Sequence, residues 1–300
     1  MIESQEVASQ RMSPTRPMYW SIRREIWENR SIYAAPVVTA CIMLFGFFIS
    51  LFTLPHRINA AMAGGAGKLH GVIEMPYDMT AGLILVTSFL VGVFYCLDAL
   101  YGERRDRSIL FWKSLPVSDR TTVFAKAAIP LVVLPLLSYA LILVTQLLIL
   151  ILSTIALLGS RAHLAALYDK LKFFQLSAAL LYAIVVIALW HAPVYCWLLL
   201  VSGWAKRATF LWAVMPFLAI GLFVRIAFGT SAFFTFLGNR LTGWFHKAFL
   251  VPVKGAPHLD PLASLTPGNL LTAPELWFGL IFAAMCVAAT VCLRRYREPI

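Results

Sequence analysis

Long apolar runs alternate with short polar segments along most of this chain. A helix needs about 20 mainly apolar residues to cross the hydrocarbon core of a bilayer. Six runs reach that length, at residues 32–54, 80–100, 128–158, 178–201, 208–228 and 275–293. The pattern therefore predicts an all-α polytopic membrane protein with six transmembrane helices. The third run is longer than a bilayer requires, so we expect it to tilt, to kink at Pro130 or Pro135, or to project beyond the membrane.

The residues before the first run predict an amphipathic helix. In the segment 17–30, at about 100° per residue, Ile22 and Ile26 fall on one side, whereas Glu25 and Glu28 fall on the other. Such a helix is expected to lie in the inner headgroup layer of the membrane, with its polar side toward water. The alternative is that these residues are only the helical start of the first span.

Two segments between the runs differ from ordinary connections. Residues 229–273 alternate aromatic residues with glycine and single cations, which makes them too polar to span and too apolar to be fully solvated. They predict short re-entrant helices that dip into the outer leaflet before the last span; a partly ordered surface loop is the alternative. Residues 55–79 are rich in glycine and predict a flexible outer loop. Their GGAGK sequence is not a phosphate-binding loop, because Met62 and Leu69 replace the required Gly and Ser/Thr.

Composition supports a membrane protein and excludes several other classes. Of the residues, 60% are hydrophobic and 13% are charged, whereas soluble domains are about one-quarter charged. The net charge of +11 is explained by the excess of Lys and Arg on the cytoplasmic side of membrane proteins, and we expect no nucleic-acid binding. Basic residues concentrate before the first span, in the loop 101–126, at Lys206-Arg207 and at Arg294-Arg295. Both termini are therefore predicted to be cytoplasmic.

The sequence contains no recognisable catalytic motif. The six histidines and five cysteines lack metal-ligand spacing, so we expect no catalytic residue, metal or cofactor in this chain. Three polar residues within the spans could line a translocation path: His191, Tyr195 and Gln146. The alternatives are structural. A neutral His191 could bond a carbonyl freed by Pro193, and Gln146 could join two helices by a hydrogen bond.

The loop after the second span has the features of a docking surface for another protein. Arginine and aromatic side chains supply most of the binding energy at protein interfaces, although a charge run is more often just a solvated face. After Pro116, Ser118 is suited to be the N-cap of a short helix over 119–126. The candidate docking residues are Glu103, Arg104, Arg105, Asp106, Arg107, Phe111, Trp112, Pro116 and Asp119.

The stretch LDALYGERRDRSILFWKSLPVSDRTTVFAK at 97–126 and the stretch APVYCWLLLVSGWAKRATFLWAVMPF at 192–217 resemble bacterial permease subunits of the ABC-2 family of ATP-binding-cassette transporters. The resemblance implies a cytoplasmic tail and connecting helix at 1–31, followed by a six-helix transmembrane domain at 32–300. It implies that 101–126 is the coupling loop and that 229–273 is the re-entrant segment.

Such a permease acts with partners. The resemblance implies a separate ATPase subunit that binds ATP and Mg²⁺, a second permease subunit, contacts with membrane lipids and a place in the bacterial inner membrane. The expected activity is export of an amphiphilic cargo, such as a peptide antibiotic, a lipid or a drug. The alternatives are an ion-coupled secondary carrier, for which the spans lack carboxylates and inverted repeats, and a non-catalytic membrane scaffold.

Overall fold

The computed structural model describes residues 15–64, 66–108, 117–159, 161–250 and 261–296. These residues form helices and their connections, and within them the only β-type pairing is an isolated bridge between Phe249 and Leu265. Six helical stretches in the described part are long and apolar enough to cross a membrane. The predicted fold class, an all-α multi-pass membrane protein, is confirmed.

The helices follow one another along the chain with short connections. The first half forms α1 (Thr15–Glu28), α2 (Ser31–Ser50), α3 (Leu54–Ala63), α4 (Ala66–Asp98), α5 (Tyr101–Arg105), α7 (Asp119–Ala128), the π-helix η1 (Ile129–Val133) and α8 (Leu134–Ala156). The second half forms α9 (Arg161–Lys170), α10 (Phe173–Trp204), α11 (Thr209–Phe228), α12 (Ala232–Thr242), α13 (Trp244–Ala248), α14 (Pro267–Leu271) and α15 (Pro274–Tyr296).

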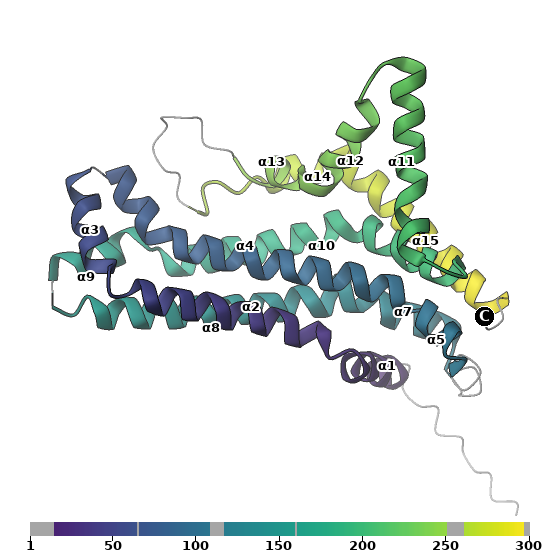
Figure 1. Ribbon diagram of the computed structural model, residues 1–300, viewed down its shortest axis with the longest axis horizontal. Coiled ribbons are helices and arrows are strands. Elements are labelled where there is room, and N and C mark those ends of the chain that lie inside the picture. The colour runs from purple at the N-terminus through teal and green to yellow at the C-terminus, as the bar shows by residue number, and fades with distance from the viewer. Residues whose placement is uncertain (1–14, 65, 109–116, 160, 251–260, 297–300) are drawn as a thin grey trace, which may run out of the picture.

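Four long helices, α2, α4, α8 and α10, lie side by side as an elongated bundle, and α15 packs along α10 (Figure 1). Small polar side chains link the bundle helices. Ser138 of α8 donates a hydrogen bond to Ser88 of α4 at 2.7 Å, and the hydroxyl oxygens of Thr39 in α2 and Thr87 in α4 lie 3.1 Å apart. Such contacts help to join helices in lipid, where burial from water does not drive their association.

The third apolar run is part of one continuous helical stretch, α7–η1–α8, over residues 119–156. At about 1.5 Å per residue it is longer than the hydrocarbon core is thick, which agrees with the predicted projection. A π-turn includes Pro130, whose missing N–H would interrupt a regular helix at this point. Ser118 is the N-cap as predicted and accepts a hydrogen bond from the Thr121 N–H at 3.1 Å. The expected separate helix 119–126 is instead the first part of the span.

The prediction of a flexible loop at 55–79 is wrong. These residues form most of α3 and the first part of α4, and the two helices pack together through Ile58, Ile73 and Tyr77. Glycine costs about 1 kcal/mol per position in a helix relative to alanine. Burial of large apolar side chains on the facing sides of α3 and α4 outweighs that cost.

The segment before the last span contains the short helices α12, α13 and α14, as its mixed composition predicts. It is held against α10, where the Trp190 indole donates to the carbonyl of Arg240 at 2.8 Å. The Arg240 guanidinium lies 4.8 Å from the centre of the same indole ring. Residues 251–260 of this segment lie outside the described part of the chain.

The turn between α10 and α11 contains a strained residue. Ala208, the N-cap of α11, has φ 50° and ψ 56°, in the left-handed region that costs an L-residue about 1–2 kcal/mol. We expect Ala208→Gly to raise the free energy of unfolding by about 1 kcal/mol, after allowing for the greater freedom of glycine in the unfolded chain. Thermal unfolding in detergent would show a higher midpoint. As a control, Ala213→Gly within α11 should lower the midpoint, and equal decreases in both variants would contradict the left-handed turn.

Candidate functional site

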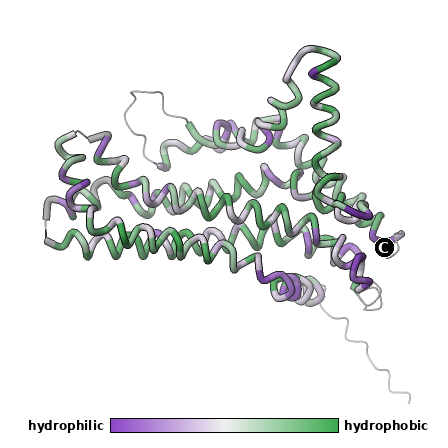
Figure 2. The backbone as a smooth tube through the Cα atoms, viewed as in Figure 1, coloured by the Kyte–Doolittle hydropathy of each residue, from purple (hydrophilic) through white to green (hydrophobic). Residues whose placement is uncertain are grey.

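Segments from distant parts of the chain meet at one end of the bundle, which we call the charged end. It is formed by α1, α5, α7 and the last turns of α15, and the C-terminus of α10 packs against α5 (Figure 1). Hydrophilic positions are frequent in these segments, whereas the middle of the bundle is apolar (Figure 2). The basic segments before α2, after α4 and at the end of α15 therefore lie together in space.

Glu25 of α1 is an anchor of this arrangement. Its side chain is 1% exposed, and its carboxylate accepts hydrogen bonds from the Tyr95 hydroxyl of α4 at 2.8 Å and the Lys126 ammonium of α7 at 2.9 Å. The neighbouring Arg24 donates to the same carboxylate at 2.6 Å. One carboxylate thus joins α1 to both α4 and α7.

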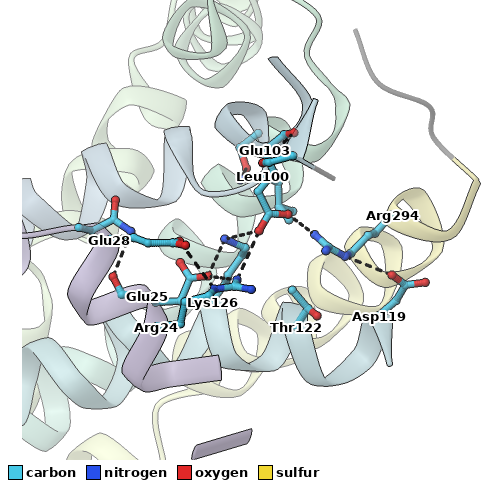
Figure 3. A network of polar contacts seen from close by, with 12 residues as sticks. Arg24, Glu25, Glu28, Leu100, Glu103, Asp119, Thr122, Lys126 and Arg294 are labelled. Carbon is cyan, nitrogen blue, oxygen red and sulfur yellow. Dashed lines mark hydrogen bonds and ion pairs between the residues drawn. The ribbon is translucent and has the colours of Figure 1, made fainter. Parts of the chain in front are cut away.

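Glu103 of α5 has a similar role on the other side of Lys126 (Figure 3). One carboxylate oxygen lies 3.1 Å from the Lys126 ammonium and 3.5 Å from the Arg24 guanidinium. The other accepts a 2.6 Å hydrogen bond from Arg294 of α15. Arg294 also donates to Asp119 of α7 at 3.1 Å, so that Glu103 and Arg294 connect α1, α5, α7 and α15.

These contacts form an ion-pair network, consisting of Arg24, Glu25, Glu103, Asp119, Lys126 and Arg294. Glu28 adds a further, half-exposed carboxylate 3.7 Å from the Arg24 guanidinium, and the side chains of Lys126 and Arg294 are each only 3% exposed. Removing such charges from water is costly unless each is paired and hydrogen-bonded. The network therefore requires all of its helices in place, and it specifies their relative positions.

The electrostatic environment favours the ionised form of Glu25. Burial alone would raise the pKa of this carboxyl, but Lys126 and Arg24 more than offset that effect, and the pKa is lowered from its ordinary value. A carboxyl with a lowered pKa in the folded state stabilises the fold fully above its unfolded pKa, about 4.3. That contribution is lost as the pH falls through the lowered folded value.

The lowered pKa of Glu25 predicts how the stability of the protein depends on pH. We expect the contribution of Glu25 to be constant from neutral pH to about pH 5, to decrease below the unfolded pKa and to vanish once the pH has fallen through the lowered folded pKa. Thermal unfolding in detergent at a series of pH values, for the wild type and for Glu25→Gln, measures it. The variant should have the lower midpoint at neutral pH, and the two midpoints should converge in acid. A difference between the two midpoints that stays constant down to pH 3 would contradict this prediction.

Arg104 stabilises the junction between α5 and α10 rather than facing solvent. It is 3% exposed, and its guanidinium donates to the carbonyls of Gly203 and Ala205 at the C-terminus of α10. The last carbonyls of a helix lack partners within the helix and attract cations. The N–H of Leu100 adds a hydrogen bond to the Ser202 hydroxyl at 3.3 Å.

The residues predicted to dock another protein thus fall into three groups. Glu103, Arg104 and Asp119 make the internal contacts described above. Arg105 and Asp106 pair with each other at 3.0 Å, with side chains 56% and 62% exposed, and Arg107 is also exposed. The remaining three, Phe111, Trp112 and Pro116, lie outside the described residues. Among the predicted docking residues of the described part, the run 105–107 is exposed, Asp119 is about one-third exposed, and Glu103 and Arg104 are largely covered.

The amphipathic helix α1 is confirmed, but its polar side does not face water throughout, because the Glu28 side chain is 49% exposed and that of Glu25 only 1%. Glu25 points into the protein, where its carboxylate pairs with the Lys126 ammonium at 2.9 Å. Ile22 and Ile26 pack beside it against the core. The exposed side carries Trp20 and Trp27, with the Arg23 guanidinium 5.2 Å and 4.5 Å from their ring centres. Tryptophan and arginine are suited to the headgroup layer of a membrane.

The three polar residues proposed for a translocation path do not form one group. His191 lies between two carbonyl oxygens, of Ile187 at 2.9 Å and Leu241 at 3.1 Å. Its ring and that of Tyr195 both contact the ring of Phe89, at centroid distances of 5.0 and 5.8 Å.

Gln146 belongs to a different part of the bundle. Its side chain donates to the carbonyl of Tyr77 in α4 at 3.4 Å, which joins α8 to α4 as the structural alternative anticipated. His191 likewise forms hydrogen bonds with carbonyl groups. Neither of them is the carbonyl of Leu189, which Pro193 leaves without its helical partner.

Sequence reasoning missed Glu25, Tyr95, Lys126 and Arg294 as members of the site. A weak signal was present, because Lys126 immediately precedes the third apolar run and Arg294 ends the last one. Charges at those places are usual in membrane proteins and are read as topology signals. Their specific pairing with Glu25 and Glu103 depends on contacts between residues far apart in sequence.

No protein-family model matches the chain, and comparisons with curated proteins and with solved structures give no match either. The arrangement at the charged end therefore has to be interpreted from its own geometry. It contains a rigid buried network that joins four helices, with a short exposed charged segment directly beside it.

Proposed function

We propose that this multi-pass membrane protein is the permease subunit of an ABC-2 type exporter, driven by a separate cytoplasmic ATPase that binds the charged end. ATP and Mg²⁺ bind to that ATPase, and a second permease subunit completes the transporter. The cargo is an amphiphilic molecule such as a peptide antibiotic, a lipid or a drug. In this proposal the protein lies in the bacterial cytoplasmic membrane with both termini inside.

The observation that carries the proposal is the connection between the exposed loop and the spans. Arg105 and Asp106 directly follow Glu103 and Arg104, which are fixed to α15, α7 and α10. A displacement of the loop by a bound ATPase is therefore transmitted to α7. Because α7 continues through η1 into α8, the same displacement reaches the bundle itself.

The distribution of charge supports the orientation. The basic segments that lie together at the charged end are those that the positive-inside rule assigns to the cytoplasm. Placing this end inside also positions Trp20, Arg23 and Trp27 of α1 in the inner headgroup layer. A cytoplasmic ATPase can reach the charged end only in this orientation.

The position of α11 supports a second subunit. This helix projects from the bundle (Figure 1), and only Ala213 and Gly221 on it are buried. Large apolar side chains along it are exposed, including Phe223 at 65% and Ile226 at 76%. A long apolar helix with so few internal contacts has a surface that a second permease subunit can cover.

Reconstitution tests the proposal. The chain is co-expressed with candidate Walker-motif ATPases from the same genome, and any complex that purifies is placed in proteoliposomes. We expect the ATPase to co-purify and ATP hydrolysis to increase when an amphiphilic cargo is added. Cargo transport by the chain alone, driven by an ion gradient with no ATPase present, would contradict the proposal and favour a secondary carrier.

A further inference from the structure

An open cavity of about 810 Å³ lies between α3 and α4, at the end of the bundle opposite the charged end (Figure 1). Its size is within the range of sites that bind small molecules. The residues lining it are both charged and apolar, and those used below are Arg57, Lys68, Gly71, Met75, Asp78 and Met79. None of them belongs to the ion-pair network.

The cavity lies at the level of the membrane boundary. The 20 residues of α2 correspond to about 30 Å, the thickness of the hydrocarbon core, and α2 begins beside α1 at the charged end. It ends at Ser50, only a few residues before α3 begins at Leu54. The helix α3 and the first turns of α4 therefore lie where lipid headgroups are found on the far side of the membrane.

Charges of both signs line the cavity. Within the described part of the chain, the side chains of Arg57, Lys68 and Asp78 have no ion pair or hydrogen bond with another group. The exposed side chains of Met75 and Met79, one turn apart on α4, lie beside them. A second carboxylate, that of Glu74, also lines the cavity one turn before Asp78, so the cavity combines two cations, two carboxylates and a flexible apolar surface.

We propose that this cavity binds the headgroup of a zwitterionic phospholipid that carries a primary ammonium, from the surrounding bilayer. The lipid phosphate contacts Arg57 and Lys68, and its ammonium donates to the Asp78 carboxylate. The acyl chains run along Met75 and Met79 on the surface of α4. An anionic headgroup satisfies the two cations but places negative charge beside the carboxylates of Glu74 and Asp78, so it fits less well. This site requires only that the helices span a membrane, and it does not depend on coupling to an ATPase.

A matched pair of glycine substitutions tests whether lipid binding requires the empty volume of the cavity. Gly71 and Gly82 both lie on α4, and a Cβ atom added at either position meets no atom within 4 Å. Gly71 lines the cavity and Gly82 does not. Leucine is the better helix former, so both Gly71→Leu and Gly82→Leu should fold, but only the first fills the cavity.

The measurement is native mass spectrometry of detergent-purified protein titrated with dioleoyl phosphatidylethanolamine. We expect Gly71→Leu to reduce the affinity for this lipid by about tenfold, because a headgroup displaced by the leucine can no longer make all of its charge-assisted contacts, and Gly82→Leu to leave the affinity unchanged. If both variants bind as the wild type does, the proposal is wrong.

Headgroup chemistry provides an independent test that needs no change of volume. The wild type should prefer phosphatidylethanolamine to phosphatidylcholine, whose methylated ammonium cannot donate a hydrogen bond, and to phosphatidylglycerol, which lacks the ammonium. Asp78→Asn should remove most of this preference, whereas Asp106→Asn at the charged end should preserve it. Equal binding of all three lipids by the wild type would show a non-selective surface and overturn the proposal, even if the ATPase-coupled function is correct.

Discussion

Replacing Lys126 with methionine is expected to lower the free energy of unfolding by about 3–5 kcal/mol, the usual effect of removing one partner from a buried ion pair. Methionine has a similar volume, so the change creates little empty space. It leaves the buried carboxylates of Glu25 and Glu103 without the cation that lies between them at 2.9 and 3.1 Å. Equilibrium unfolding in mixed detergent micelles measures the difference.

Two further variants separate this effect from the loss of any lysine. Lys247 pairs with Glu275 at 3.4 Å, and these side chains are 43% and 49% exposed, so Lys247→Met should cost less than about 1 kcal/mol. Adding Glu25→Gln to Lys126→Met removes one of the stranded charges and should restore part of the lost stability. A cost for Lys126→Met no larger than that for Lys247→Met would show that the network contributes little.

Reversing the charge at Arg105 is expected to weaken binding of the ATPase by about tenfold or more, with little effect on stability. Placing like charges opposite each other at an interface costs several kcal/mol. The Arg105 side chain is 56% exposed, pairs with its exposed neighbour Asp106 and lies 5.7 Å from the centre of the Tyr101 ring, so Arg105→Glu should change the thermal midpoint only slightly. Binding of the ATPase to the protein in nanodiscs, measured at low and at physiological salt, gives the affinity.

The matched control reverses an exposed cation at the other end of the molecule. Lys68→Glu should bind the ATPase as the wild type does, because Lys68 lies beside α3, away from the charged end. Equal affinities for Arg105→Glu and Lys68→Glu would place the ATPase contact elsewhere. A large loss of stability in Arg105→Glu would instead show that this residue supports the fold.

The sequence was sufficient to predict the six spans because their signal is local. A run of about 20 apolar residues has few alternatives to a spanning helix. The N-cap at Ser118 was predictable for the same reason, since an N-cap depends on residues within one helical turn. The helices extend beyond the apolar runs, as α4 does from Ala66, because packing continues past the hydrocarbon layer.

The burial of charge was not predictable from the sequence. A glutamate such as Glu25 on an amphipathic helix normally faces water, and here it faces inward because Lys126 lies 2.9 Å away, although the two are 101 positions apart in the chain. Arg104 likewise resembled a solvated residue of a charge run, yet it binds the C-terminus of α10. Such pairings arise only when segments distant in sequence are brought together.

This difference changes the interpretation of the loop. The sequence suggested that the whole charge run contacts a partner, with Glu103 among the contacts. In the structure Glu103 supports the loop from within, and Arg105 and Asp106 form the exposed surface. We therefore expect substitutions at Glu103 to act on stability and on transmission of movement, and substitutions at Arg105 to act on binding.

The central claim is that the charged end faces the cytoplasm and binds a separate ATPase. A photo-crosslinking amino acid placed at Arg105 in living cells tests it most directly, with the same group at Lys68 as the reference position. The account predicts an adduct between position 105 and an ATP-binding subunit, and none from position 68. Labelling of a cysteine at 105 by a membrane-impermeant reagent added outside intact cells, with no ATPase adduct, would contradict it.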